Sequence, residues 1–238
     1  MTEFQKILAD SARQAGFELT DLQLQQFDKY YEMLVETNKV MNLTALTEPQ
    51  DVAVKHIVDS LMAYADYFPG KVLADVGTGA GFPGIPLKIY CPALKVVLID
   101  SLAKRLNFLQ RVIDELGLTD IECVHLRAED AGKNAAHREK YDIVTARAVA
   151  RLSVLSEYCL PLVKVGGMFV ALKGAKYKEE IAAAGKALNV LGGKLVKAQQ
   201  VELPGLDDGR AVVTIKKVKA SPKAYPRKAG LPEKNPLE

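Results

Sequence analysis

The chain has 238 residues, of which 49% are hydrophobic and 26% are charged, and its formal net charge is +3. These values are typical of soluble globular proteins and exclude a mostly disordered or fibrous chain. We expect a cytoplasmic protein, because the first residues lack the pattern of a secretory signal and the longest uncharged run, from Val76 to Leu87, is too short to span a bilayer.

Residues 1–67 predict an N-terminal helical region. Apolar residues recur at helical spacing over residues 4–15 and again over residues 22–35. Thr20 and Thr47 are each followed three residues later by a glutamine, and this capping-box pattern predicts that a helix begins after each threonine.

Residues 68–218 predict an α/β domain, because short apolar strands alternate with helical segments such as 102–116. Two further β-rich runs are separated by a loop rich in Pro, Gly and Asp, which predicts a hairpin. We therefore expect a mostly parallel seven-stranded sheet with helices on both faces and an antiparallel last strand. The predicted strands are 71–76, 95–100, 121–126, 141–146, 168–173, 194–203 and 210–218.

Residues 219–238 predict a basic, proline-rich C-terminal tail. The segment 216–238 holds seven Lys and Arg residues against two Glu, a net charge of +5, which leaves −2 for the rest of the chain. Four prolines and a single aromatic residue leave little that could pack. We expect this tail to fold onto RNA, with a solubilising role as the alternative. Its removal should then weaken RNA binding and spare the affinity for a cofactor.

The three cysteines, Cys91, Cys123 and Cys159, are widely spaced among apolar residues. This spacing predicts buried free thiols and neither a disulfide framework nor a zinc site. Since His125 and His137 are also far apart along the chain, we expect no metal.

Residues 72–84 contain the motif that indicates a ligand site. An apolar strand ends in Asp75, and a turn containing Gly77, Gly79 and Gly81 leads into a helix. Such glycine-rich turns let a nucleotide-type ligand approach backbone that a Cβ atom would block. We therefore expect a nucleotide-type ligand in this turn.

The identity of that ligand has two candidates. Gly79, Gly81 and Gly84 match the dinucleotide pattern, and Asp100 follows about 20 residues later, which suggests an NAD-dependent dehydrogenase. However, Gly79 does not follow the strand directly, and Asp75 at the mouth of the site would repel a pyrophosphate and attract an ammonium group. The residues thus favour a ligand with an amino group and a ribose.

Six segments together resemble the RsmG (GidB) family of class I S-adenosylmethionine (SAM)-dependent methyltransferases. They are Asn42-Leu-Thr44, His56-Ile-Val-Asp59-Ser60-Leu61, Asp75-Val-Gly-Thr-Gly-Ala-Gly-Phe-Pro-Gly-Ile-Pro-Leu87, Asp100-Ser-Leu-Ala-Lys-Arg105, Arg147-Ala148 and Leu172-Lys-Gly174. The resemblance runs from about residue 20 to the end and implies a Rossmann-like fold, SAM as cofactor, and methylation of a guanine N7 atom in 16S (small-subunit) ribosomal RNA.

The same resemblance implies roles for individual residues. It places Gly77 and Phe82 on the cofactor, Ala128 and Glu129 beside its adenine, and Arg147 near the methyl-transfer face. Asp100 would hold the ribose hydroxyls, since a carboxylate offers two close acceptor oxygens. The full set of expected cofactor residues is Asp75, Gly77, Gly79, Gly81, Phe82, Asp100, Ala128, Glu129 and Arg147.

The chemistry of guanine N7 requires no general base, because its lone pair already lies in the ring plane. Arg147 is therefore predicted to position the substrate by donating to guanine O6 or to a phosphate. His56 and Asp59 could contact RNA or form a structural hydrogen bond. Other basic residues are expected on RNA, namely Lys104, Arg105, Arg151, Lys173, Lys223, Arg227 and Lys228. We expect a monomer, and a non-catalytic RNA-binding or assembly factor is the alternative function.

Overall fold

Two capped helices open the chain in the computed structural model, which describes residues 1–238. Helix α1 spans Glu3–Gln14 and α2 spans Asp21–Met41. The predicted capping box at Thr20 is confirmed, because its hydroxyl accepts from the backbone N–H of Gln23 and the Gln23 side chain accepts from the N–H of Thr20.

The capping box predicted at Thr47 is wrong. Helix α3 spans Pro49–Asp51, so its N-cap is Glu48, which makes no side-chain cap bond. The reason is Pro49, whose fixed φ suits the first position of a helix. The helical path then continues without a break through the π-helix η1 (Val52–Val58) and helix α4 (Asp59–Leu61). A π-helical register is rare and often occurs at functional sites.

Seven strands form one sheet in the order β3-β2-β1-β4-β5-β7-β6. Only β7 runs against its neighbours, and the other pairs are parallel, as predicted. Strand β5 begins earlier than predicted because Gly166 and Gly167 interrupt its apolar pattern. The strands are β1 (Val72–Val76), β2 (Lys95–Asp100), β3 (Ile121–His125), β4 (Tyr141–Arg147), β5 (Val163–Lys173), β6 (Gly193–Gln200) and β7 (Ala211–Lys217).

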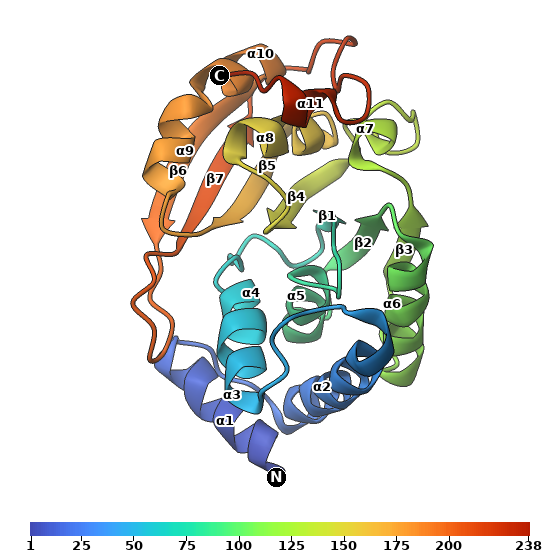
Figure 1. Ribbon diagram of the computed structural model, residues 1–238, viewed down its shortest axis with the longest axis vertical. Coiled ribbons are helices and arrows are strands. Elements are labelled where there is room, and N and C mark those ends of the chain that lie inside the picture. The colour runs from blue at the N-terminus through green and yellow to red at the C-terminus, as the bar shows by residue number, and fades with distance from the viewer.

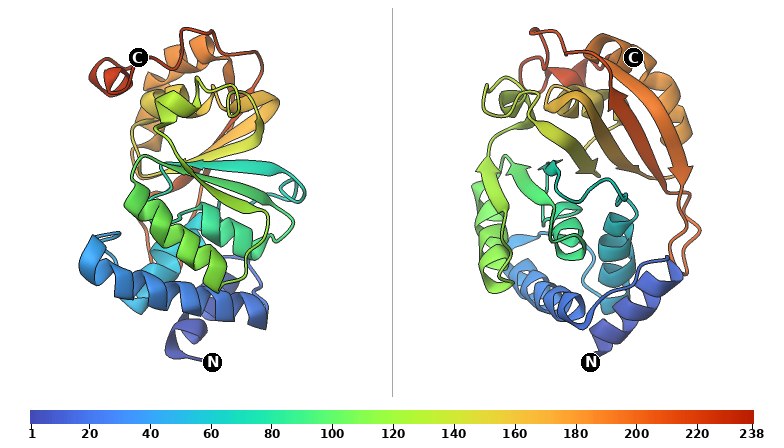
Figure 2. Two further views of the ribbon diagram at one scale, coloured as in Figure 1. Left: turned by 90° about the vertical axis from the view of Figure 1, so that its right-hand side faces the viewer. Right: turned by 180° about the vertical axis from the view of Figure 1, so that it is seen from behind.

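Helices cover both faces of this sheet, with the N-terminal helices on one side and the C-terminal ones on the other (Figures 1 and 2). They include α5 (Gly84–Tyr90), α6 (Ala103–Glu115), α7 (Ala128–Ala131), α8 (Leu152–Cys159), α9 (Tyr177–Ala183), α10 (Gly185–Leu191) and α11 (Leu231–Lys234). Phe27 of α2 and Leu73 of β1 belong to the same hydrophobic cluster. The predicted division between residues 67 and 68 therefore crosses a shared core, and it stays a prediction.

The C-terminal segment 219–238 packs on the body, and the expectation that it has little to pack with is wrong. Ser221 and Pro232 are buried, and α11 lies beside α8 (Figure 1). Glu157 of α8, whose side chain is 1% exposed, pairs with Arg227 of the segment at 2.6 Å. The composition of the segment did not reveal this, because polar groups of the body provide the anchoring contacts.

The folded chain exposes 10704 Å², close to the roughly 10,500 Å² that surface scaling gives for this mass. No helix combines the length and hydropathy needed to cross a membrane. Cys91 and Cys159 are buried free thiols, as predicted, whereas Cys123 is partly exposed.

Candidate active site

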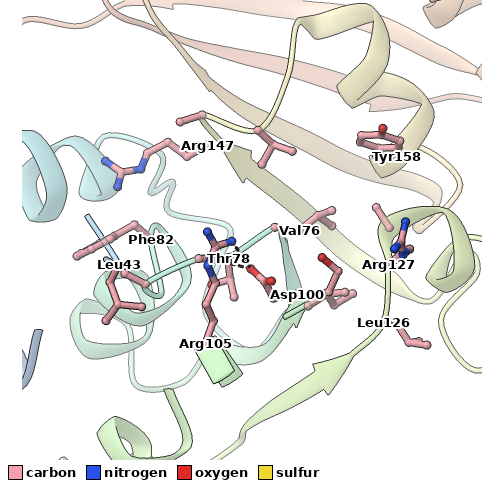
Figure 3. Close-up of a pocket in the computed structure, with 18 of the residues that line it drawn as sticks. Leu43, Val76, Thr78, Phe82, Asp100, Arg105, Leu126, Arg127, Arg147 and Tyr158 are labelled. Carbon is pink, nitrogen blue, oxygen red and sulfur yellow. Dashed lines mark hydrogen bonds and ion pairs between the residues drawn. The ribbon is translucent and has the colours of Figure 1, made fainter. Parts of the chain in front are cut away.

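A cavity of about 570 Å³ opens at the carboxyl ends of β1, β2 and β4. This is the edge where open α/β sheets bind ligands. Phe82 and Arg147 lie at one end of the cavity, Arg127 and Tyr158 lie at the other, and Asp100 lies between them (Figure 3). Strands thus fix the centre of the site, while the loops that follow them form its two ends.

The glycine-rich turn after β1 needs glycine for two different reasons. Gly77 lines the cavity with φ +69°, and a Cβ atom there would lie 2.8 Å from Cγ2 of Val149. Gly81 does not line the cavity, contrary to its predicted role on the cofactor. A Cβ atom at Gly81 would lie 2.7 Å from the hydroxyl oxygen of Tyr30, which itself donates to the carbonyl of Ala80. Gly81 is therefore required for packing against α2.

Asp75 is fully buried behind the turn, and its predicted position at the mouth of the site is wrong. Its Oδ2 atom accepts from the Thr78 hydroxyl at 2.7 Å and from the Gly84 N–H at 3.0 Å, while Oδ1 has no partner. Burial raises the pKa of Asp75 to about 6. Its side chain braces the turn that holds the ligand, since it points toward the start of α5 and not into the cavity.

We expect Asp75→Asn to stabilise the protein above pH 6. The raised pKa means that the folded state favours the protonated carboxyl, so the stability this group contributes at low pH is lost as pH rises through about 6. Asparagine keeps an acceptor for Thr78 and Gly84 without the buried charge. Urea unfolding at pH 8 should show a gain of about 1–3 kcal/mol that vanishes near pH 4. A variant less stable than wild type at pH 8 would contradict this account.

Asp100 ends β2 and lies at the centre of the cavity. Its Oδ2 atom accepts from the Gly79 N–H at 3.0 Å and lies 3.4 Å from Nη1 of Arg105, while Oδ1 accepts from the Leu102 N–H at 2.9 Å. A carboxylate has about four acceptor positions. Asp100 therefore ties the turn after β1 to the start of α6 and can still accept from a ligand hydroxyl.

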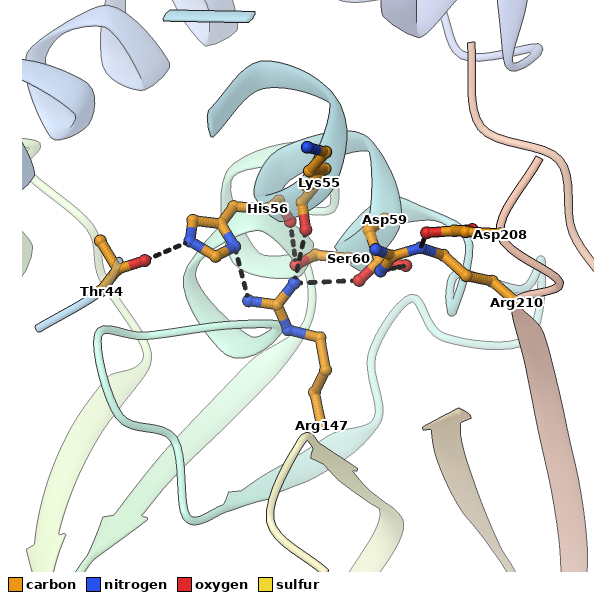
Figure 4. A network of polar contacts seen from close by, with 8 residues as sticks. All are labelled: Thr44, Lys55, His56, Asp59, Ser60, Arg147, Asp208 and Arg210. Carbon is orange, nitrogen blue, oxygen red and sulfur yellow. Dashed lines mark hydrogen bonds and ion pairs between the residues drawn. The ribbon is translucent and has the colours of Figure 1, made fainter. Parts of the chain in front are cut away.

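Arg147 ends β4 and joins it to η1 and α4. Its Nη1 atom donates to the Lys55 carbonyl at 2.8 Å and to Oδ2 of Asp59 at 2.9 Å, and Nη2 contacts Nδ1 of His56 at 3.1 Å (Figure 4). The guanidinium also lies 5.0 Å from the centre of the Phe82 ring. Arg147 is thus held from several sides, and only 13% of its side chain is exposed.

His56 is neutral, and its hydrogen bonds define the tautomer. Because Arg147 can only donate, Nδ1 of His56 accepts, and Nε2 carries the proton that it donates to the Thr44 hydroxyl at 2.8 Å. Burial and the nearby Arg147 lower the pKa of His56 to about 3. The ring also stacks on Phe82 at 4.5 Å. His56 and Asp59 therefore hold Arg147, which favours the structural interpretation of this pair over direct RNA contact.

Asp59 has a second cationic partner that the sequence did not suggest. Nη1 of Arg210, at the end of the β6–β7 loop, lies 3.2 Å from Oδ1 of Asp59, and Asp208 in turn holds Arg210 (Figure 4). The Asp59 side chain is 5% exposed, and the two arginines compensate its buried charge. Asp59 appeared among the family segments, whereas Arg210 was only the first residue of the predicted strand 210–218 and had no distinguishing pattern.

The structure separates the basic residues that were predicted to bind RNA. The prediction is wrong for Lys173 and Arg227. Lys173 is 7% exposed and forms an ion pair with Glu180, and Arg227 forms one with Glu157, so both charges are compensated within the protein. Arg105 lines the cavity, and Arg151 is exposed but pairs with Glu238. Lys104, Lys223 and Lys228 are exposed without an ion-pair partner.

Of the expected cofactor residues, all but Asp75 and Gly81 line the cavity. The structure adds lining residues that the sequence analysis did not assign to the cofactor, among them Leu43, Arg127, Tyr158, Gly230 and Glu233. Gly230 and Glu233 belong to the C-terminal segment. No local pattern could have identified them, because they reach the site only through the path that the segment takes over α8.

The comparisons with known proteins identify the family of the chain. The family model described as GidB, rRNA small subunit methyltransferase G, matches residues 23–206. Ribosomal RNA small subunit methyltransferase G of Lactobacillus acidophilus is 56% identical over 93% of this chain and 94% of that protein. The protein of the same name from Desulforamulus reducens is 51% identical over 100% of both chains.

Among solved structures, a SAM-dependent methyltransferase from Aquifex aeolicus has a similar fold. It is 19% identical, with a TM-score of 0.55 over 74% of this chain and 97% of that chain. This likeness confirms the predicted class I methyltransferase fold. The match over residues 23–206 and the identities above 50% settle the narrower question, and the chain belongs to the GidB family, rRNA small subunit methyltransferase G.

Proposed function

We propose that the protein transfers the methyl group of SAM to the N7 atom of a guanine in 16S ribosomal RNA. The observation that carries this proposal is the convergence of Gly77, Phe82, Asp100, Ala128 and Arg147 on one cavity, although they are dispersed along the sequence. These are residues that the family resemblance assigned to the cofactor and the methyl-transfer face.

The cavity suits a nucleoside ligand that is rich in hydrogen-bond donors. The carboxylates of Asp100, Glu129 and Glu233 line it, so hydroxyl and amino groups find acceptors. Because Arg105, Arg127 and Arg147 also line the cavity, its charge does not exclude a pyrophosphate, and the family match is what counts against the dehydrogenase alternative. Asp100 would hold the ribose, and the protein backbone at Gly77 would contact the ligand. When bound, SAM supplies an electrophilic methyl group attached to a sulfonium.

The protein's own task is alignment, because the lone pair of guanine N7 needs no base. The site agrees with this requirement, since Nδ1 of His56 is already occupied by Arg147 and arginine stays protonated. Phe82, stacked against His56 and under the Arg147 guanidinium, forms a rigid wall at that end of the cavity. Holding reacting groups in a fixed geometry can contribute about 7–11 kcal/mol.

The basic side chains near the cavity would meet the RNA backbone. Lys104 and Arg105 begin α6 and Arg151 precedes α8, so all three stand close to the carboxyl edge of the sheet. Contacts of this kind make RNA binding weaken as salt concentration rises. A ribosomal RNA substrate would also place the protein in the cytoplasm.

Methyl transfer should be tested with tritiated SAM on small subunits and on free 16S ribosomal RNA from cells that lack this protein. We expect tritium in the 16S RNA and 7-methylguanosine in its nuclease digest by mass spectrometry. SAM binding without transfer to either substrate would instead favour the non-catalytic assembly factor. Calorimetric heat with NADH and none with SAM would favour the dehydrogenase.

A further inference from the structure

The C-terminal wall, as we call residues 219–238, lies largely outside the reach of sequence interpretation. The family model ends at residue 206, before this segment begins. Nevertheless Gly230 and Glu233 line the cavity, and the Glu233 carboxylate lies 3.5 Å from the hydroxyl of Tyr158, another lining residue. Part of the predicted ligand site is therefore formed by the last stretch of the chain.

Of the side chains of the body that hold this wall in place, Arg138 and Glu157 make the most contacts with it. The guanidinium of Arg138 donates to the carbonyls of Ser221 at 2.7 Å, Tyr225 at 2.8 Å and Pro222 at 3.2 Å. Glu157 accepts from the backbone N–H of Arg227 at 2.8 Å in addition to its ion pair with the side chain. Hydrogen bonds to charged groups are the stronger ones in proteins. The wall therefore has a single defined position and is not a loose tail.

The wall also supports the loop that carries the predicted adenine residues. The N–H of Gly230 donates to Oε1 of Glu129 at 3.1 Å. Gly132, at the end of α7, lies so close to Pro226 that a Cβ atom on it would be 2.7 Å from Cγ of that proline. The segment of α7 thus lies between the cavity on one side and the C-terminal wall on the other.

We propose that docking of the C-terminal wall completes the cofactor pocket, so that wall docking and SAM binding stabilise each other. This rests on the proposed function, because it takes SAM as the ligand of the cavity. Such coupling is reciprocal: a change that releases the wall must weaken SAM binding, and bound SAM must hold the wall down. The expectation from composition, that removing residues 219–238 spares cofactor affinity, is thereby reversed.

The test measures SAM affinity by calorimetry on the full-length protein and on Arg138→Ala. Arg138 does not line the cavity, so its replacement removes no ligand contact; besides releasing the wall, it frees the Gly132 carbonyl at the end of α7. We expect the Kd for SAM to rise about tenfold, as the loss of one to two hydrogen bonds at the pocket would produce. Arg13→Ala, which replaces an exposed arginine of α1, is the matched control and should bind SAM like wild type.

A second readout follows the wall directly. Trypsin should cleave after Lys223 and Lys228 faster in Arg138→Ala than in wild type, and saturating SAM should slow cleavage in wild type. Arg138→Ala that is cleaved faster but binds SAM with the wild-type Kd would overturn the inference.

Where Arg138→Ala fails to fold, Glu157→Gln decides, since Glu157 does not line the cavity and the substitution removes the ion pair to Arg227 while keeping an acceptor for the Arg227 N–H. An unchanged Kd in that folded variant would likewise overturn the inference. A wild-type protein that binds no SAM at all would refute the proposed function itself, an outcome distinct from normal SAM binding that ignores the wall.

Discussion

Replacing Arg147 with lysine is expected to reduce methyl transfer by about 100-fold while the protein stays folded. Lysine keeps the positive charge next to Asp59, but it cannot donate at once to the Lys55 carbonyl, Asp59 and His56. Because Arg210 also pairs with Asp59, the buried carboxylate retains a partner and the melting temperature should change little.

The measurement should separate positioning from cofactor binding. We expect kcat on small subunits to fall much more than the affinity for SAM, since Arg147 is assigned to the methyl-transfer face. Arg13→Lys, an exposed arginine on α1, serves as the matched control. Wild-type turnover in Arg147→Lys would remove this residue from the site, and an unfolded variant would be recognised by its circular dichroism spectrum.

Asp100→Ala is expected to lower SAM affinity on the order of 100-fold. The substitution removes the proposed acceptor for the ribose hydroxyls, and it also frees the Gly79 N–H and the Leu102 N–H that position the turn around the ligand. Calorimetric titration with SAM measures the loss. Because Asp100 is 3% exposed, some loss of thermal stability should accompany it.

The control for this variant is Asp114→Ala, an exposed carboxylate on the same helix that Asp100 precedes. Asp114 accepts only from Gln110, so SAM affinity should be unaffected there. If Asp100→Ala bound SAM as tightly as wild type, the carboxylate would have a structural role in the turn and the cofactor would contact other groups.

The sheet was predictable because each strand is a short apolar run that a helix or turn interrupts. Parallel strands that are buried on both faces appear in the sequence as continuous apolar runs. The hairpin of β6 and β7 was indicated by its Pro-Gly-Leu-Asp-Asp-Gly loop. The prediction at Thr47 failed at a single position, where Pro49 determined the helix start more strongly than a threonine side chain did.

The site was predictable where chemistry follows a strand end, as it does for Asp100 and Arg147. Asp75 lies one residue before the end of β1, and its side chain points to the buried face; the pattern alone could not show whether it points to ligand or to protein. The contacts of Arg210, Arg138 and Glu157 depend on pairings between distant segments, and residues of this kind carry no local signature.

The ion pair between Glu157 and Arg227 has a consequence for the order in which a newly made chain matures. Seventy residues separate the two partners. Until Arg227 has been synthesised, the Glu157 carboxylate on α8 has no counter-charge at its nearly buried position. Asp59 pairs with Arg147 earlier in synthesis, and only its second partner, Arg210, comes late. A partly translated chain can therefore contain most strands of the sheet and still lack a complete active site. The nascent chain would then become active only when its synthesis is almost complete.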